Sequence, residues 1–119
     1  MTQEDKEILL KDLCARLPYG VVYHRNDGAN IKLNAIDVKR GLLNYTDYID
    51  ERECMPYLRP MSSMTEEERN EYRQKQTNYE FGYFDTYASI DWLNKKGFDY
   101  RGLIQMNLAL PAKEGMYNK

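Results

Sequence analysis

The 119-residue sequence lacks a strong net charge, because 17 Lys and Arg residues oppose 19 Asp and Glu residues and leave a net charge of −2. So balanced a charge creates no long-range field that would draw the protein to DNA, RNA or an anionic membrane, and nucleic acid is not an expected partner without a local basic patch. The longest apolar runs are triplets such as Ile8-Leu9-Leu10, whereas a membrane-spanning helix needs about 20 apolar residues. The N-terminal sequence MTQEDK has neither the basic start nor the apolar stretch of a secretion signal. We therefore expect no membrane contact and a cytoplasmic location.

Cysteine and histidine are scarce. Cys14 and Cys54 are the only cysteines, they form no CxxC pair, and His24 is the single histidine. This scarcity indicates neither a zinc site nor a disulfide framework, and both thiols are expected to be free. The sequence also lacks the phosphate-loop, dinucleotide-binding, HExxH and GxSxG signatures. We expect no metal and no cofactor, and an enzyme is the less favoured hypothesis.

Aliphatic residues are few, and tyrosines are many. Leu, Ile, Val and Phe together number 24, close to the composition of disordered chains, but 11 tyrosines accompany them. A tyrosine buries a large ring while its hydroxyl finds a hydrogen-bond partner, so a core short of aliphatic residues can form around aromatic ones. The sequence predicts one folded domain over residues 1–119.

The N-terminal segment predicts a helix. Thr2 is a suitable N-cap, and acidic residues fill the first turn of a helix that runs to about Arg16. Pro18 and Gly20 then end it. Apolar residues recur at spacings of three and four and should form one buried stripe, made of Leu9, Leu10, Leu13, Cys14 and Leu17. Cys14 is therefore expected to be a buried thiol.

The next segment predicts a β-hairpin. Val21, Val22 and Tyr23 favour a strand, Asn26-Asp27-Gly28 is typical of a tight turn, and residues 30–38 alternate as a second strand with a slip near Ala35. Residues 42–49 could supply a third strand whose limits the pattern does not define.

The C-terminal half predicts two helices. Residues 56–60 should be extended between two prolines, and Thr65 starts a capping box for a surface helix from Glu66 to about Thr77. The sequence pattern predicts no particular secondary structure for the aromatic stretch 79–87. A second helix, capped by Thr86 or Ser89, should end at Lys96 before Gly97. Residues 111–119 are polar and predicted to be a loose tail.

These elements give an α+β fold class: a small, mainly antiparallel sheet with an N-terminal helix and two helices in the C-terminal half. We expect the N-terminal and C-terminal helices to cover one face of the sheet.

Three segments resemble a known family. Residues 9–21, LLKDLCARLPYGV, and residues 98–104, FDYRGLI, together with YLRPMSSMTEE at 57–67, resemble a family of uncharacterised small bacterial proteins often found in mobile-element or prophage settings. The resemblance implies that setting, and it implies no activity, cofactor or catalytic residue for any position here.

Four candidate chemistries can be weighed. His24, beside Arg25 and opposite Lys32 on the predicted hairpin, could act as a general base only with a pocket and an orienting partner, so an exposed strand residue is favoured. Cys54 lies near two arginines that could lower its pKa, but a partly covered, inert thiol is favoured. The third candidate is an acidic group that fits no EF-hand loop and should be a solvated loop, made of Asp47, Asp50, Glu51 and Glu53.

The fourth candidate is the segment 98–102. Tyr100 and Arg101 are residue types enriched among interface anchors, so they are the predicted binding residues. The favoured alternative is structural, with Phe98 and Tyr100 holding the helix end on the sheet and Asp99 paired with Arg101. The leading function hypothesis is a non-enzymatic accessory protein that binds an unknown protein partner. The alternatives are single-stranded nucleic-acid binding through Tyr stacking, and a hydrolase that uses His24.

Overall fold

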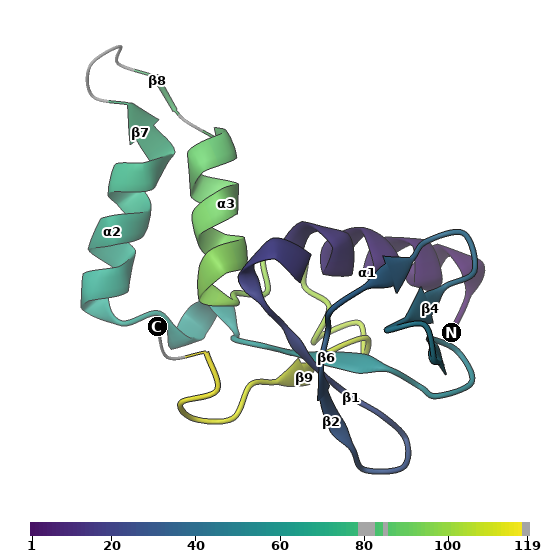
Figure 1. The fold of residues 1–119 in the computed structure, drawn as a ribbon. Helices are drawn as coiled ribbons and strands as arrows, with labels where there is room; N and C mark the ends of the chain where they lie inside the picture. Colours follow the sequence, from purple (N-terminus) through teal and green to yellow (C-terminus); the bar gives the residue numbers. More distant parts are fainter. Residues whose placement is uncertain (79–82, 85, 118–119) are drawn as a thin grey trace.

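The computed structural model describes residues 1–78, 83–84 and 86–117. It confirms an α+β fold with an N-terminal helix, two later helices and mostly antiparallel strands (Figure 1). Within this described part of the chain, no helix is both long and apolar enough to cross a lipid bilayer. In chain order the elements are α1 (Gln3–Arg16), η1 (Leu17–Tyr19), β1 (Val22–His24), β2 (Asn30–Lys32), β3 (Ile36–Asp37), β4 (Leu42–Leu43), β5 (Asp47–Tyr48), β6 (Met55–Leu58), η2 (Met61–Ser63), α2 (Glu66–Gln76), β7 (Thr77–Asn78), β8 (Tyr83–Phe84), α3 (Thr86–Lys96) and β9 (Leu110–Pro111).

Helix α1 begins with a capping box in which the Thr2 hydroxyl accepts from the Asp5 N–H at 3.0 Å and the Asp5 carboxylate accepts from the Thr2 N–H at 3.1 Å. The predicted helix is confirmed, but the predicted burial of Cys14 is wrong, because that residue is exposed. The buried face carries a polar pair as well as leucines: Leu9, Leu10, Asp12, Leu13 and Arg16. Each residue turns a helix by about 100°, so burying this pair rotates Cys14 toward solvent.

The larger sheet has the strand order β2-β1-β6-β9. β1 is antiparallel to β2 and to β6, which confirms the predicted hairpin, and β9 is parallel to β6. Gly28 in the hairpin turn has a φ of +90°, a conformation that favours glycine. The predicted extended segment around Pro56 is the strand β6.

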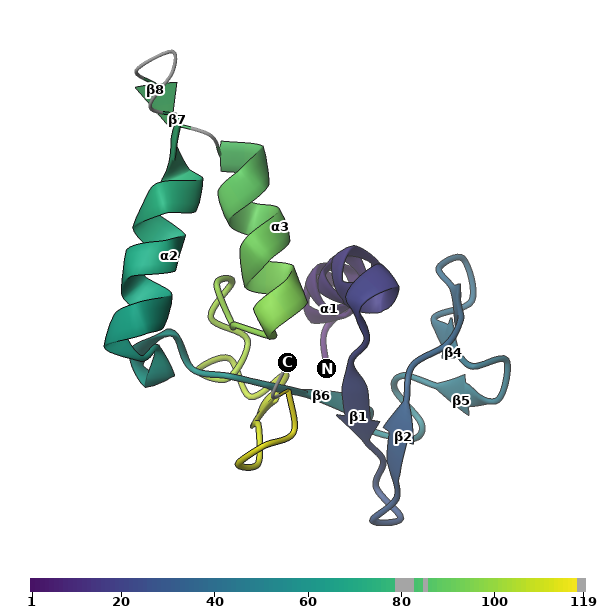
Figure 2. The same ribbon diagram turned by 60° about the vertical axis from the view of Figure 1, so that its left-hand side comes forward.

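Residues 36–48 form a second sheet rather than one added strand. Its order is β3-β4-β5, with both pairs antiparallel (Figure 2). The Asn44 side chain binds the segment that links the two sheets. Its oxygen accepts from the N–H groups of Asn34 at 2.7 Å and Ala35 at 3.1 Å, and its amide donates to the Lys32 carbonyl at 2.9 Å. The slip expected near Ala35 is therefore the break between β2 and β3.

Helices α2 and α3 pack against each other and project away from the larger sheet (Figures 1 and 2). The expected capping box is present, since the Glu68 N–H donates to the Thr65 hydroxyl at 3.1 Å, and α2 buries no residue, as predicted for a surface helix. The hairpin has its own core, in which the Trp92 ring stacks between Tyr72 and Phe98 at 5.6 and 5.7 Å. α3 thus completes a helical hairpin and does not join α1 over the sheet as expected. Most of the aromatic stretch 79–87 lies outside the described residues.

The segment after β9 is ordered by one tyrosine. Tyr117 is only 8% exposed, and its hydroxyl accepts from the Val22 N–H at 3.0 Å and donates to the Tyr57 carbonyl at 2.6 Å. The hydroxyl thereby bridges β1 and β6. Its ring lies against Gly97, where an added Cβ would be 2.8 Å from a ring carbon. The loose tail over residues 111–119 stays a prediction, except that Tyr117 is held against β1 and β6, and residues 118–119 lie outside the described part.

Candidate functional site

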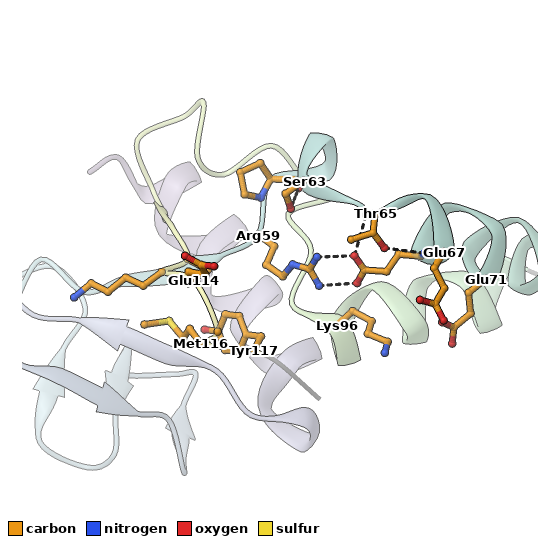
Figure 3. Close-up of a pocket in the computed structure, with 14 residues that line it drawn as sticks. Arg59, Ser63, Thr65, Glu67, Glu71, Lys96, Glu114, Met116 and Tyr117 are labelled. Carbon is orange, nitrogen blue, oxygen red and sulfur yellow. Dashed lines mark hydrogen bonds and ion pairs between the residues drawn. The ribbon is translucent and has the colours of Figure 1, made fainter.

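An open cavity of about 750 Å³ lies at the base of the α2–α3 hairpin (Figure 3). Its walls come from the segment that joins β6 to α2, the first two turns of α2, the end of α3 and residues 112–117. Ligand cavities in proteins usually measure about 300–1,000 Å³, so this one has the size of a binding site.

An ion pair holds the centre of the cavity wall. The Arg59 guanidinium donates to both Glu68 carboxylate oxygens, at 2.8 and 2.7 Å, and lies 4.1 Å from the centre of the Phe98 ring. These hydrogen bonds, more than any other contact, lower the pKa of Glu68 to about 2. Glu68 also accepts from the Thr65 N–H at 3.0 Å in the capping box. Arg59 and Glu68 thus join α2 to the residue that follows β6.

Further charged side chains line the cavity. Within the described part of the chain, the side chains of Glu67, Glu71, Lys96 and Glu114 make no hydrogen bond or ion pair. Lys113 also lines the cavity, with its ammonium 5.5 Å from the centre of the Tyr57 ring. Among the described residues, the cavity is thus lined by three carboxylates and two ammonium groups that have no hydrogen-bond or ion-pair partner.

The predicted binding residues Tyr100 and Arg101 lie in a polar junction between α1 and the hairpin. Its centre is the buried pair Asp12 and Arg16, 0% and 1% exposed, joined at 2.7 Å. Arg16 also donates to the Phe98 carbonyl at 2.7 Å, while its Nη1 is buried without a partner among the described groups.

Tyr100 and Arg101 add to this junction. The Arg101 Nε donates to Asp12 at 3.1 Å, and the Tyr100 hydroxyl donates to Asn94 at 3.0 Å. The guanidinium carbons of Arg16 and Arg101 lie 5.2 and 5.1 Å from the centre of the Tyr100 ring. The Arg101 side chain keeps 26% of its surface exposed, and its role in binding a partner stays a prediction.

The expected pairing of Asp99 with Arg101 is wrong. The Asp99 carboxylate instead accepts from the N–H groups of Leu103 at 2.9 Å and Ile104 at 3.0 Å, where it orders the loop after the helix.

His24 does not meet the requirements of the hydrolase hypothesis. Its Nδ1 lies 3.0 Å from the Asn30 side-chain oxygen and 3.2 Å from the Tyr57 hydroxyl, so its partners are neutral. The residue opposite His24 on β2 is Asn30, not Lys32 as expected. The nearby carboxylate of Asp27 is taken by Arg25. The orienting carboxylate that a histidine base needs is not supplied by any of these contacts.

The acidic group divides between two environments. Asp50, Glu51 and Glu53 are exposed, as expected, but Asp47 is 1% exposed and accepts from the Tyr23 hydroxyl and from Arg25 at 3.2 Å. The prediction of a solvated loop is therefore wrong for Asp47, which joins the smaller sheet to β1. No three His, Cys, Asp or Glu side chains gather as metal ligands within the described residues.

Cys54 is fully buried beside Asp47, more deeply than expected. Burial, with a smaller contribution from the Asp47 charge, raises the pKa of its thiol to about 12. Arg25 and Arg52 lower the pKa of this thiol, but their effect is smaller than that of burial. The expectation of an inert thiol agrees with this environment.

One exposed surface, around Tyr45, was not predicted from the sequence. Asn44 and Tyr45 both have positive φ, +53° and +63°, in a tight turn closed by the Thr46 N–H donating to the Leu43 carbonyl at 3.1 Å. Tyr45 is 75% exposed at this turn, and Tyr48 (44%) and Val38 (56%) are exposed on the same small sheet. The Asn44 position was the available signal, since asparagine favours the first place of such turns.

No protein-family model, curated protein or solved structure matches this chain. The resemblance to the small bacterial family stays a prediction, and function is argued from geometry.

Proposed function

We propose that this is a non-enzymatic accessory protein that binds another protein through the surface around Tyr45, in the mobile-element or prophage setting that the family resemblance implies. The observation that carries the proposal is the position of Tyr45, a large aromatic side chain with 75% of its surface exposed on left-handed backbone.

The backbone at Tyr45 is costly for folding. A residue with a Cβ in the left-handed region loses about 1 kcal/mol relative to glycine, and strain of this kind collects at functional sites. A tight turn with both φ angles positive is normally made by Asn-Gly, so glycine in place of Tyr45 would relieve the strain. A tyrosine here therefore contributes something other than stability, and tyrosine is among the residues that dominate binding energy at protein interfaces.

The surroundings of Tyr45 define the partner. Tyr45 lies in the turn between β4 and β5, Tyr48 lies in β5, and Val38 directly follows β3, so all three belong to one small sheet of directly paired strands. Lys39 and Arg40 are exposed between β3 and β4. Arg40 forms an ion pair with Asp37 at 3.5 Å, and Lys39 adds positive charge to this surface. The matching partner has an apolar patch bordered by carboxylates.

The same side chains favour a second candidate function, the binding of single-stranded nucleic acid. Tyrosines can stack on unpaired bases while Lys39 and Arg40 contact phosphates, although the balanced net charge of the whole chain weakens such binding.

Capture experiments with matched variants test the proposal. Immobilised parent protein and the Tyr45→Ser/Tyr48→Ser variant are exposed to a lysate of the source organism, with Tyr87→Ser as control because Tyr87 is 87% exposed on α3. Proteins retained by the parent and the control but lost by the double variant are the expected result. Identical retention by all three would refute the Tyr45 surface.

Two further measurements complete the test. Tyr45→Gly should leave the free energy of unfolding unchanged or raise it by up to about 1 kcal/mol, which separates the binding role of this tyrosine from stability. Micromolar, salt-sensitive binding of oligothymidine that Tyr45→Ser/Tyr48→Ser abolishes would replace protein binding with the second candidate.

A further inference from the structure

We infer that residues 112–117 form a strap that opens and closes without unfolding the rest of the chain, with Tyr117 as its latch. The strap is the segment that follows β9, drawn in yellow in Figure 1. It supplies one wall of the cavity at the base of the α2–α3 hairpin (Figure 3). Opening the strap removes that wall and widens the cavity.

The latch takes the place of a hydrogen bond between two strands. The paired residues of β1 and β6 end at Tyr23 and Pro56. One position further along, Val22 and Tyr57 would form the next pair, but the Tyr117 hydroxyl lies between them. It accepts from the Val22 N–H at 3.0 Å and donates to the Tyr57 carbonyl at 2.6 Å. A hydroxyl can accept and donate at once, and water can satisfy the same two backbone groups when the latch leaves.

The strap is fastened at its two ends. At its start the Ala112 N–H donates to a carbonyl of β6 at 2.8 Å, and at its end Tyr117 is buried. Residues 113–115 are exposed, and the Met116 N–H donates to the Lys113 carbonyl at 3.0 Å within the strap itself. Segments with few buried contacts open at a lower free energy than the whole domain. Release of Tyr117 is therefore the step that frees the strap.

Gly97 provides the place where the latch closes. An added Cβ at Gly97 would lie 2.8 Å from a carbon of the Tyr117 ring, whereas non-bonded carbons prefer about 3.5–4.0 Å. A methyl group at position 97 therefore pushes the ring out of its closed position.

Gly102 offers a matched control for this clash. The φ angles of Gly97 and Gly102 are similar, +81° and +76°, so alanine strains the backbone at both positions. An added Cβ at Gly102 meets no described atom within 4 Å. Alanine at position 97 alone acts on the latch.

Native-state hydrogen exchange on the full chain measures the opening, followed by NMR at urea concentrations below the unfolding transition. The Val22 N–H reports the latch, and the Leu33 N–H, which donates to the Val21 carbonyl at 2.9 Å, reports the pairing of β1 with β2. After correction for intrinsic rates, Val22 should exchange at least about tenfold faster than Leu33, with a weaker dependence on urea because opening exposes little surface. Protection of Leu33 excludes fraying of β1 as the cause.

Two results of this measurement would overturn the inference. Equal rates and equal urea dependence at Val22 and Leu33 would show that the strap opens only when the chain unfolds. Exchange at Val22 as fast as in an unstructured peptide would show that the latch does not close.

The variants Gly97→Ala and Gly102→Ala then test the latch itself. Backbone strain is the same with the strap open or closed, whereas the clash at position 97 destabilises the closed form alone. Val22 should exchange about tenfold faster in Gly97→Ala and within about twofold of the parent in Gly102→Ala. An equal change in both variants, or no change in Gly97→Ala, would refute Tyr117 as the latch. If Gly97→Ala does not fold, the comparison of Val22 with Leu33 in the parent decides.

Discussion

Replacing Tyr117 by phenylalanine removes one hydroxyl and keeps the ring. That hydroxyl accepts from the Val22 N–H at 3.0 Å and donates to the Tyr57 carbonyl at 2.6 Å, so Tyr117→Phe leaves two backbone groups without a partner between β1 and β6. Each unsatisfied buried group costs about 1–3 kcal/mol, and we expect the free energy of unfolding to fall by about 2–4 kcal/mol in total. For a chain of this length this corresponds to a melting temperature lower by about 10 °C.

Urea unfolding followed by circular dichroism measures the change. The midpoint should fall while the slope of the free energy against urea concentration stays constant, since the variant exposes the same surface on unfolding. Tyr87→Phe removes a hydroxyl from a tyrosine that is 87% exposed and should change stability by less than about 0.5 kcal/mol. A Tyr117→Phe variant as stable as this control would refute the proposed bridge between the strands.

The pH dependence gives an independent check on Tyr117. Burial raises the pKa of its hydroxyl from 10.0 to about 12. Between these values the unfolded chain has released the proton that the folded chain retains, so this group's contribution to stability is complete below pH 10.0 and is lost as the pH rises toward 12. The stability difference between the parent and Tyr117→Phe should therefore shrink over that range.

Three other results are expected. Native protein should react with one equivalent of a thiol reagent, at Cys14, and the reaction should be slow because partial burial raises the pKa of that thiol. Cys54 should react only after denaturation. Labelling of both cysteines in the native protein would contradict the burial of Cys54. Glu68→Gln should lower the free energy of unfolding by about 1–3 kcal/mol at neutral pH. The difference from the parent should vanish as the pH falls from 4.5 toward 2, because the ion pair lowers the pKa of Glu68 to about 2. A difference independent of pH would count against the ion pair. Asp12→Asn should cost about 3–5 kcal/mol in a thermal melt, because it leaves the buried Arg16 charge uncompensated; a cost under about 1 kcal/mol would show that this charge is not held by Asp12.

The sequence by itself determined the local features of this protein. The N-cap at Thr2, the capping box at Thr65, the Asp27-Gly28 turn and the helix end at Gly97 were predicted and are present. Each depends on residues within about four positions along the chain, where backbone geometry fixes the distances whatever the rest of the fold does. The α+β class followed from the same local patterns.

Tertiary structure alone decided which polar groups are buried and which apolar ones are exposed. Arg16 is held by the carbonyl of Phe98, 82 positions away, and Tyr117 by that of Tyr57, 60 positions away. Asp12 and Asp47 look like surface residues in the sequence. Arg16 stands one helical turn after Asp12, but the burial of that pair, and the ion pairs of Asp12 with Arg101 and of Asp47 with Arg25, arise only once the chain is folded. The cavity likewise joins α2 to residues 112–117. Hydrophobic periodicity reports only the average preference of each residue for water, and a charge that finds its partner on a distant segment reverses that preference.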